Sequence, residues 1–311
     1  MSILGRSFIR SADLSGERIH SFFEYVLDLK NESNQHKNFD RLIQKDHRKV
    51  IALLFFEPST RTRFSFEIAA KRIGISTTTL DSAASTSLTK GETLIDTIFN
   101  ICAMKPDALV IRHSGNKEVN DCIRDLKVPV INAGDGTDEH PTQALLDAFT
   151  ILEHRPKKEK SKVLFVGDVK HSRVAQSDRR LFERLGFELG YTAPESLAPT
   201  EKEWSQARNF KTLNEGLAWC DVVMGLRLQQ ERYSGAEYID LNSYIENYRL
   251  DYNSLQSLKA DGLIMHPGPF VPEVDLSSDV LSDPRCVIHQ QVENGVYVRM
   301  ALLSEILGLR K

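Results

Sequence analysis

Residues 55–67 read FFEPSTRTRFSFE and join an apolar run to a helix-forming segment. The run, residues 50–56, is continuous in apolar residues and predicts a strand buried on both faces. Ser59 is a helix-capping residue type, and the helix that follows it is expected to end at Gly74. The expected apolar face of this helix is Phe64, Ile68, Ala69 and Ile73. A buried strand that leads directly into a helix indicates an α/β protein.

The first turn of that helix is suited to bind an anion. A helix N-terminus presents unpaired N–H groups and a partial positive charge. The hydroxyls of Ser59, Thr60 and Thr62 add donors, and so do the guanidinium groups of Arg61 and Arg63. A capped helix with two solvated arginines is the alternative. The whole stretch, directly after a buried strand, favours a phosphate-binding site.

The composition supports a globular protein with substantial cores. The 311 residues are 41% hydrophobic, enough for one large or two ordinary domains. A formal net charge of −3 without a basic block argues against nucleic acid as a partner. No apolar run approaches about 18 residues, and the first residues lack the layout of a signal peptide. We therefore expect a cytoplasmic protein that neither spans nor binds a membrane.

Apolar runs alternate with helix-like segments along the chain. The runs predict strands at residues 50–56, 108–111, 128–132, 162–166, 187–192, 221–225 and 262–265. The segments between them predict helices at residues 59–73, 93–104, 116–126, 141–152, 172–185, 200–206 and 213–219, with a final helix at about 296–309. This alternation predicts parallel, doubly wound sheets.

A polar break at residues 153–161 indicates two such domains. We expect residues 1–142 with 292–311 to form the first domain and residues 143–291 the second. Two helices would join them, one of which begins at Pro141. The active site is expected in the cleft between the domains.

Polar clusters follow the predicted strands at their carboxyl ends, where open α/β sheets bind ligands. They comprise Ser59–Arg63, Arg112 with His113, His140 with Gln143, Gly167–Arg173, Arg227 with Gln229, and His266–Pro269. Most of these residues are cationic or can donate hydrogen bonds, so the site favours anionic substrates, and more than one of them. Taken singly, several of the clusters could instead be explained as a helix cap, a solvated edge or a plain turn.

Three features suggest how individual clusters work. His140 precedes Pro141, which suits the first helical position, and the helix dipole there disfavours the charged imidazole. Arg173 lies in the first turn of a helix that Ser172 is expected to cap, where the positive end of that helix dipole disfavours a cation, so an anionic partner is favoured. The turn at Gly268 and Pro269 leaves backbone carbonyls that suit an NH2 group. The polar loop with Ser87 and Lys90 could reach an anion, but alone it reads as a plain loop.

Several kinds of chemistry lack their usual motifs. The chain has no GxGxxG after a strand, no Walker loop, no HxxxH and no GxSxG elbow. Its four cysteines, Cys102, Cys122, Cys220 and Cys286, form no CxxC pair and are interpreted as reduced, buried thiols. We therefore expect no metal, no cofactor and no covalent intermediate, and catalysis by positioning and electrostatic stabilisation.

Taken together, the motifs resemble the aspartate/ornithine carbamoyltransferase family, over nearly the whole chain. The stretch Ser59–Arg63 is similar to the carbamoyl-phosphate signature that both branches share. The motifs RLQQER at residues 227–232 and HPGP at residues 266–269 resemble the catalytic chains of the aspartate branch. The ornithine branch would show an HCLP stretch and an acidic amine-binding loop, and neither is present.

The resemblance implies transfer of a carbamoyl group from carbamoyl phosphate to L-aspartate, an early step of pyrimidine synthesis. It implies that the phosphate is held by Ser59, Thr60, Arg61, Thr62 and Arg112. The carbonyl would be polarised by Thr62, Arg112 and His140, and the carbamoyl NH2 held by Gln143 and the backbone of Gly268 and Pro269. The aspartate carboxylates would be bound by Arg173, Arg227 and Gln229. Ser87 and Lys90 would enter the site of a neighbouring subunit, which implies a homotrimer.

Two departures and three alternatives accompany the resemblance. The family usually has a basic residue shortly after Pro269, whereas residues 270–273 have none, and Arg249 stands where the family often has glycine. Both bear on domain closure and aspartate affinity.

The alternatives are the same transfer to another amine such as ornithine, a catalytically silent scaffold, and a dehydrogenase, which the missing glycine motif argues against. The sequence does not decide whether regulatory chains associate.

Overall fold

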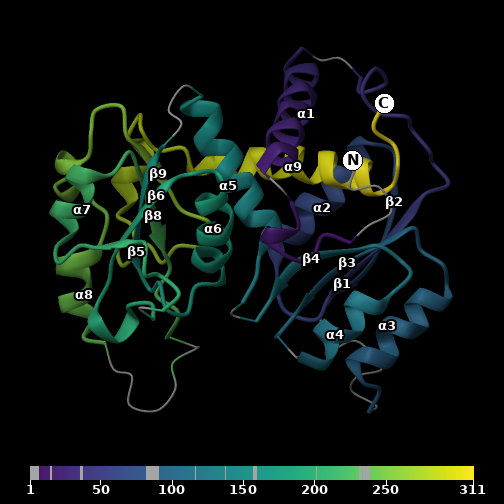
Figure 1. Ribbon diagram of the computed structural model, residues 1–311, viewed down its shortest axis with the longest axis horizontal. Coiled ribbons are helices and arrows are strands. Elements are labelled where there is room, and N and C mark those ends of the chain that lie inside the picture. Colours follow the sequence, from purple (N-terminus) through teal and green to yellow (C-terminus); the bar gives the residue numbers. More distant parts are fainter. Residues whose placement is uncertain are drawn as a thin grey trace. The chain divides into compact units, whose positions relative to one another are not determined.

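The computed structural model describes residues 7–14, 16–35, 38–81, 91–115, 117–136, 138–156, 160–200, 202–230, 233 and 239–311. The chain forms two compact units (Figure 1), one of Met1–Leu146 with Glu293–Lys311 and one of Asp147–Val292. The two divisions fall inside helices α5 (Pro141–His154) and α9 (Ile288–Ile306). None of the described helices is long and apolar enough to cross a membrane.

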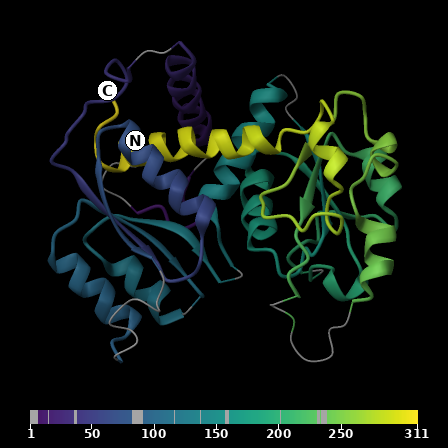
Figure 2. The ribbon, with the colours of Figure 1, turned by 180° about the vertical axis from the view of Figure 1, so that it is seen from behind.

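The first unit is built on a parallel sheet whose described strands run in the order β2-β1-β3-β4. These are β1 (Val50–Phe55), β2 (Ser76–Asp81), β3 (Ala108–His113) and β4 (Val130–Asp135). Helices α3 (Leu94–Ala103) and α4 (Lys117–Asp125) pack on one face. Helices α1 (Gly16–Asn34), α2 (Thr60–Arg72) and α9 lie over the other (Figures 1 and 2).

The second unit has a parallel sheet of the order β7-β6-β5-β8-β9 within the described residues. Its strands are β5 (Lys162–Gly167), β6 (Glu188–Thr192), β7 (Arg208–Asn209), β8 (Val222–Leu226) and β9 (Leu263–Met265). Its helices are α6 (Arg173–Arg184), α7 (Leu213–Trp219) and α8 (Leu241–Tyr248).

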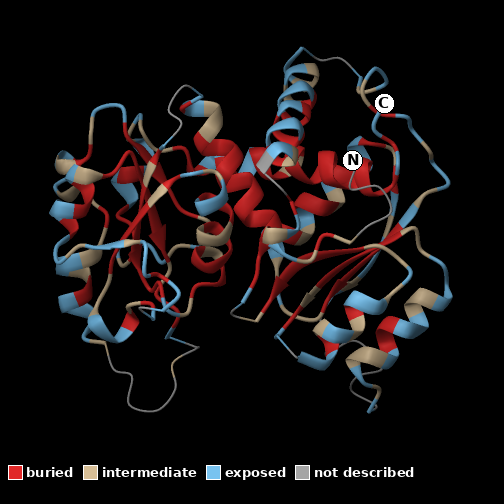
Figure 3. Cartoon of the chain, in the orientation of Figure 1, coloured by how far each residue is buried: buried red, intermediate tan, exposed pale blue. Residues whose placement is uncertain are grey.

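Side chains that alternate along β5 fill both faces of this second sheet. Leu164 and Val166 pack in one core cluster with Leu217 of α7. Phe165 points the other way and stacks on Phe182 of α6, with ring centroids 6.3 Å apart. The central strands of both sheets are buried (Figure 3), which is the physical reason that their sequences are continuously apolar.

The sequence predicted the doubly wound architecture correctly, and each predicted strand is present. Two strands were missed: β2, with the sequence STTTLD, and β7, which has two residues. Both lie at sheet edges, and none of their residues is buried, so neither shows a continuous apolar run. Helices α1 and α8 were also missed. Residues 200–206 were predicted as a helix but form turns where described, and Trp204 packs edge-on against Phe165.

Helix α9 begins at Ile288, earlier than the predicted start near residue 296. Its first turns are polar in sequence, so the apolar period does not reveal them. One of these polar residues, Gln291, forms hydrogen bonds inside the unit. Its side chain donates to Asp147 Oδ1 at 2.8 Å and accepts from the backbone N–H of His266 at 2.9 Å.

The apolar face predicted for α2 was partly wrong. Ala69 and Ile73 are buried as expected, but Phe64 and Ile68 are 48% and 41% exposed. The buried face instead includes Thr62, Ser65 and Phe66. The predicted end of the helix is confirmed, since Gly74 has φ 78° and the N–H of Ile75 donates to the carbonyl of Ala70 at 2.9 Å.

Candidate active site

The turn after β1 delivers Ser59 to the start of α2, as the sequence predicted. Ser59 is extended, with φ −159° and ψ 90°, and occupies the N-cap position. Its side chain makes no capping hydrogen bond, so the hydroxyl does not pair with an N–H group of its own helix. Thr60 and Arg61 are exposed in the first turn, whereas Thr62 is buried. The N–H groups of the helix N-terminus and the side-chain donors of residues 59–62 therefore belong to the same turn.

Arg112 lies beside this turn because β3 pairs with β1. The register sets Phe55 opposite Arg112, and the N–H of Phe56 donates to the Arg112 carbonyl at 2.9 Å. The Arg112 guanidinium is mostly buried, with its Nε 3.6 Å from Glu57 Oε2. The tertiary pairing of two strands thus brings a second cation to the first turn of α2.

Arg63, which we grouped with the anion-binding residues, makes a structural contact instead. Its guanidinium pairs with Asp81 at the end of β2 and lies 3.9 Å from Glu67 one turn along α2. Arg63 therefore ties α2 to the edge strand, and its charge is offset by two carboxylates.

His140 occupies the N-cap of α5, as its place before Pro141 predicted, and it is buried. Its carbonyl accepts from the N–H groups of Gln143 at 2.9 Å and Ala144 at 3.2 Å. The loop before it is held by Asp135, whose Oδ1 accepts from the N–H of Glu139 at 2.7 Å. The carboxylate of Glu139 in turn accepts from the Ser11 hydroxyl at 2.7 Å.

Gly136 explains how the loops after β3 and β4 approach each other. It has φ 41°, and a Cβ there would meet the carbonyl oxygen of Ser114 at 2.8 Å and the Cα of Gly115 at 2.9 Å. Both contacts are with backbone, which cannot move aside cheaply. The glycine therefore allows the His140 loop to lie against the loop that follows Arg112.

Arg299 of α9 is a buried cation that the sequence reading missed. It donates to the Ser65 hydroxyl at 2.9 Å and to the Thr142 hydroxyl at 3.3 Å. Ser65 lies on α2 and Thr142 on α5, so one guanidinium connects the two helices whose first turns carry the candidate anion-binding groups. This role of Arg299 becomes visible only when α9 packs against α2 and α5, which are distant in the sequence. The signal that the sequence offered was an arginine within an apolar helix pattern.

In the second unit, Arg173 is buried at the first turn of α6. The predicted cap is confirmed, because Ser172 Oγ accepts from the N–H of Ala175 at 3.1 Å. Arg227 and Gln229 follow β8 on an irregular segment, and the N–H of Gln229 donates to Asp168 Oδ2 at 3.1 Å. The carboxyl end of β5 therefore holds the segment that follows β8.

The HPGP turn after β9 is fixed by its own histidine. The Nδ1 atom of His266 accepts from the N–H of Gly268 at 2.9 Å, so the ring proton resides on Nε2. The ring also lies edge-on to Phe270, with centroids 5.8 Å apart. These contacts hold the carbonyls of Gly268 and Pro269 in defined positions.

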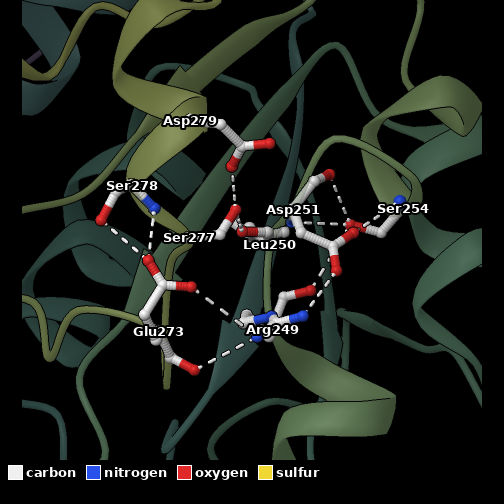
Figure 4. A network of polar contacts seen from close by, with 8 residues as sticks. All are labelled: Arg249, Leu250, Asp251, Ser254, Glu273, Ser277, Ser278 and Asp279. Carbon is white, nitrogen blue, oxygen red and sulfur yellow. Dashed lines mark hydrogen bonds and ion pairs between the residues drawn. The ribbon is translucent and has the colours of Figure 1, made fainter.

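The two departures from the family pattern meet in one polar network (Figure 4). Arg249 lies 3.1 Å from Asp251 Oδ2 and 3.9 Å from Glu273 Oε2. Glu273 Oε1 accepts from both the N–H and the hydroxyl of Ser278, at 2.9 and 2.8 Å. These hydrogen bonds from Ser278 hold the pKa of Glu273 below its usual value. Arg249 therefore places a cation beside the loop of residues 270–273, which has no basic residue of its own.

The predicted site residues Ser87 and Lys90 lie outside the described residues, and so do Glu231 and Arg232 of the RLQQER motif. Among the residues that are described, no group of His, Cys, Asp or Glu is arranged to hold a metal ion. The described candidates divide into one cluster per unit: the α2 turn, Arg112, His140 and Gln143 in the first, and Arg173, Arg227, Gln229 and the HPGP turn in the second.

The fold and these two clusters define a class of protein. Residues 6–153 match the carbamoyl-P binding domain of the aspartate/ornithine carbamoyltransferases, and residues 159–306 match their Asp/Orn binding domain. The chain belongs to the aspartate/ornithine carbamoyltransferase family.

Particular relatives carry more specific names. The chain is 46% identical over 260 residues to the aspartate carbamoyltransferase catalytic subunit of Aliarcobacter butzleri, covering 83% of this chain and 86% of that protein. The catalytic subunit of Methylorubrum populi is 46% identical over 253 residues, 81% of this chain and 80% of that one. A crystal structure of aspartate transcarbamoylase from Trypanosoma cruzi with N-(phosphonacetyl)-L-aspartic acid has a TM-score of 0.87 at 27% identity, over 98% and 96% of the two chains.

Proposed function

We propose that this chain transfers the carbamoyl group of carbamoyl phosphate to the amine of L-aspartate, giving N-carbamoyl-L-aspartate and phosphate. The observation that carries the proposal is the start of α2, where Ser59, Thr60, Arg61 and Thr62 surround a helix N-terminus beside Arg112. The relatives named aspartate carbamoyltransferase catalytic subunit support the choice of aspartate. The product belongs to an early step of pyrimidine synthesis.

In this proposal the first unit binds carbamoyl phosphate. Ser59, Thr60, Arg61, Thr62 and Arg112 hold the phosphate, which combines the helix dipole with two guanidinium charges. Thr62, Arg112 and His140 donate hydrogen bonds to the carbamoyl oxygen. Gln143 accepts from the carbamoyl NH2, and so do the carbonyls of Gly268 and Pro269, which belong to the second unit.

The second unit supplies the aspartate subsite. Arg173, Arg227 and Gln229 bind the two carboxylates, a set of donors that suits a dicarboxylate and not the side-chain ammonium of ornithine. The T. cruzi neighbour supports this choice, because its bound ligand joins a phosphonate to L-aspartic acid.

The reaction then needs little covalent chemistry from the protein. The neutral amine attacks the carbamoyl carbon, negative charge grows on the carbonyl oxygen, and phosphate leaves. Each preorganised donor at a developing oxyanion contributes about 2.7–4 kcal/mol. The departing phosphate can accept the proton of the amine, and no cofactor takes part.

We further propose a cytoplasmic homotrimer with shared sites, in which Ser87 and Lys90 of a neighbouring subunit complete the site. Phe64 and Ile68 support an interface, since they lie one turn apart on the exposed face of α2, next to the anion-binding turn. A second copy of the chain would cover them. Regulatory chains are further partners to test, because relatives are named catalytic subunits.

The test is carbamoylation by the purified protein with carbamoyl phosphate and either L-aspartate or L-ornithine. We expect carbamoyl-aspartate alone. Product from ornithine alone would keep the phosphate site but overturn the aspartate subsite, and no product from either amine would overturn the proposed reaction.

A further inference from the structure

Asp275 is a buried carboxylate that no part of the proposed mechanism uses. It is 3% exposed and lies in the loop after the HPGP turn. Burial raises its pKa, against the opposing effects of hydrogen bonds from Val271 and Leu228 and of the charge of Arg227. Keeping a carboxylate in such a place is costly, so its contacts need a reason.

One oxygen of Asp275 holds the segment that carries Arg227 and Gln229. This segment follows β8 without regular structure, so its backbone N–H groups need partners outside a strand or helix. The N–H of Leu228 donates to Asp275 Oδ1 at 3.0 Å, while the N–H of Gln229 next to it donates to Asp168. Both residues are buried, which makes these hydrogen bonds hard for water to replace.

The other oxygen of Asp275 holds the loop that begins at Gly268 and Pro269. The N–H of Val271 donates to Asp275 Oδ2 at 2.7 Å. Two N–H donors from separate loops therefore point at the two oxygens of one side chain. Only a carboxylate accepts at both ends, because an amide side chain presents NH2 at one of them.

We propose that Asp275 is a positioning residue that sets the Arg227–Gln229 segment in register with the Gly268–Pro269 turn. The inference rests on the proposed function, in which the first segment binds the aspartate carboxylates and the second accepts from the carbamoyl NH2. Aspartate affinity then depends on a carboxylate that does not touch the substrate.

The test is the variant Asp275→Asn, which keeps the shape and loses one of the two hydrogen bonds. We expect the KM for L-aspartate to rise about tenfold to a hundredfold, the equivalent of one hydrogen bond to a charged group. The KM for carbamoyl phosphate should stay within about twofold of wild type. Asp275→Glu, which keeps two acceptor oxygens, should recover part of the aspartate affinity.

The matched control is Asp283→Asn. Asp283 also accepts from a backbone N–H, that of Arg285 at 2.8 Å, in the same unit but on neither of the two segments. It should leave the KM for L-aspartate unchanged. An Asp275→Asn variant with an unchanged KM for L-aspartate, or with both KM values raised equally, would overturn the inference. Failure of the wild-type protein to carbamoylate L-aspartate would instead overturn the proposed function.

A second measurement covers the case in which Asp275→Asn does not fold. Amide hydrogen exchange is followed in the wild-type protein for residues 226–230 and 268–274, with and without phosphate plus succinate, a dicarboxylate without an amine. Coupled segments should slow together when the ligands are added. Slowing confined to residues 226–230 would overturn the inference.

Discussion

Replacing Arg299 with methionine should destabilise the first unit and weaken its proposed anion site. Arg299 is 3% exposed, and its guanidinium donates to Ser65, to Thr142 and, at 3.1 Å, to the carbonyl of Gly295. Hydrogen bonds from a charged donor contribute about 1.5–3 kcal/mol each. Part of that loss is offset, because the variant no longer buries a charge and because the hydroxyls can rotate to new acceptors. We expect a net destabilisation of about 2–4 kcal/mol.

Denaturant unfolding measures the stability of Arg299→Met, and the KM for carbamoyl phosphate measures its site. Methionine keeps an unbranched stem but removes the guanidinium carbon that lies 5.1 Å from the centroid of the Phe66 ring. We expect the KM to rise about tenfold, because α2 and α5 lose their common partner. The control is Arg72→Met, which removes an exposed guanidinium that lies 5.7 Å from the Tyr297 ring. Equal stability of the two variants would refute the reasoning.

Three further predictions concern the site and the thiols. Arg61→Ala and Arg227→Ala should each lower activity by about a hundredfold or more, with Arg227→Ala acting chiefly on the KM for L-aspartate; near-wild-type kinetics would contradict these roles. Mixing inactive Lys90→Ala chains with inactive Arg61→Ala chains should restore activity after subunit exchange, and no recovery despite proven exchange would contradict shared sites. Burial raises the pKa of Cys220 to about 12, so this thiol should resist alkylation at about pH 8 until the protein unfolds.

The architecture was predictable because buried parallel strands must be apolar along their whole length. Residues 50–56 and 162–166 show this pattern, and both form central strands. The edge strands β2 and β7 were not predictable in the same way, since none of their residues is buried and most of them are polar. Phe64 and Ile68 were wrongly predicted to be buried, because an apolar residue on a helix does not reveal which neighbour covers it.

The sequence by itself determined the two α/β sheets, the caps at Ser172 and His140, and the helix N-terminus at Ser59, because each depends on residues within a few positions of one another. Only the tertiary structure decided that Arg63 pairs with Asp81, that Arg299 joins Ser65 to Thr142, and that Asp275 holds Leu228 and Val271. Most of these contacts connect residues far apart in the chain, and local propensity carries no information about which distant partner a buried charge will meet. A buried charge must nevertheless be satisfied, so the fold, once formed, assigns its partners.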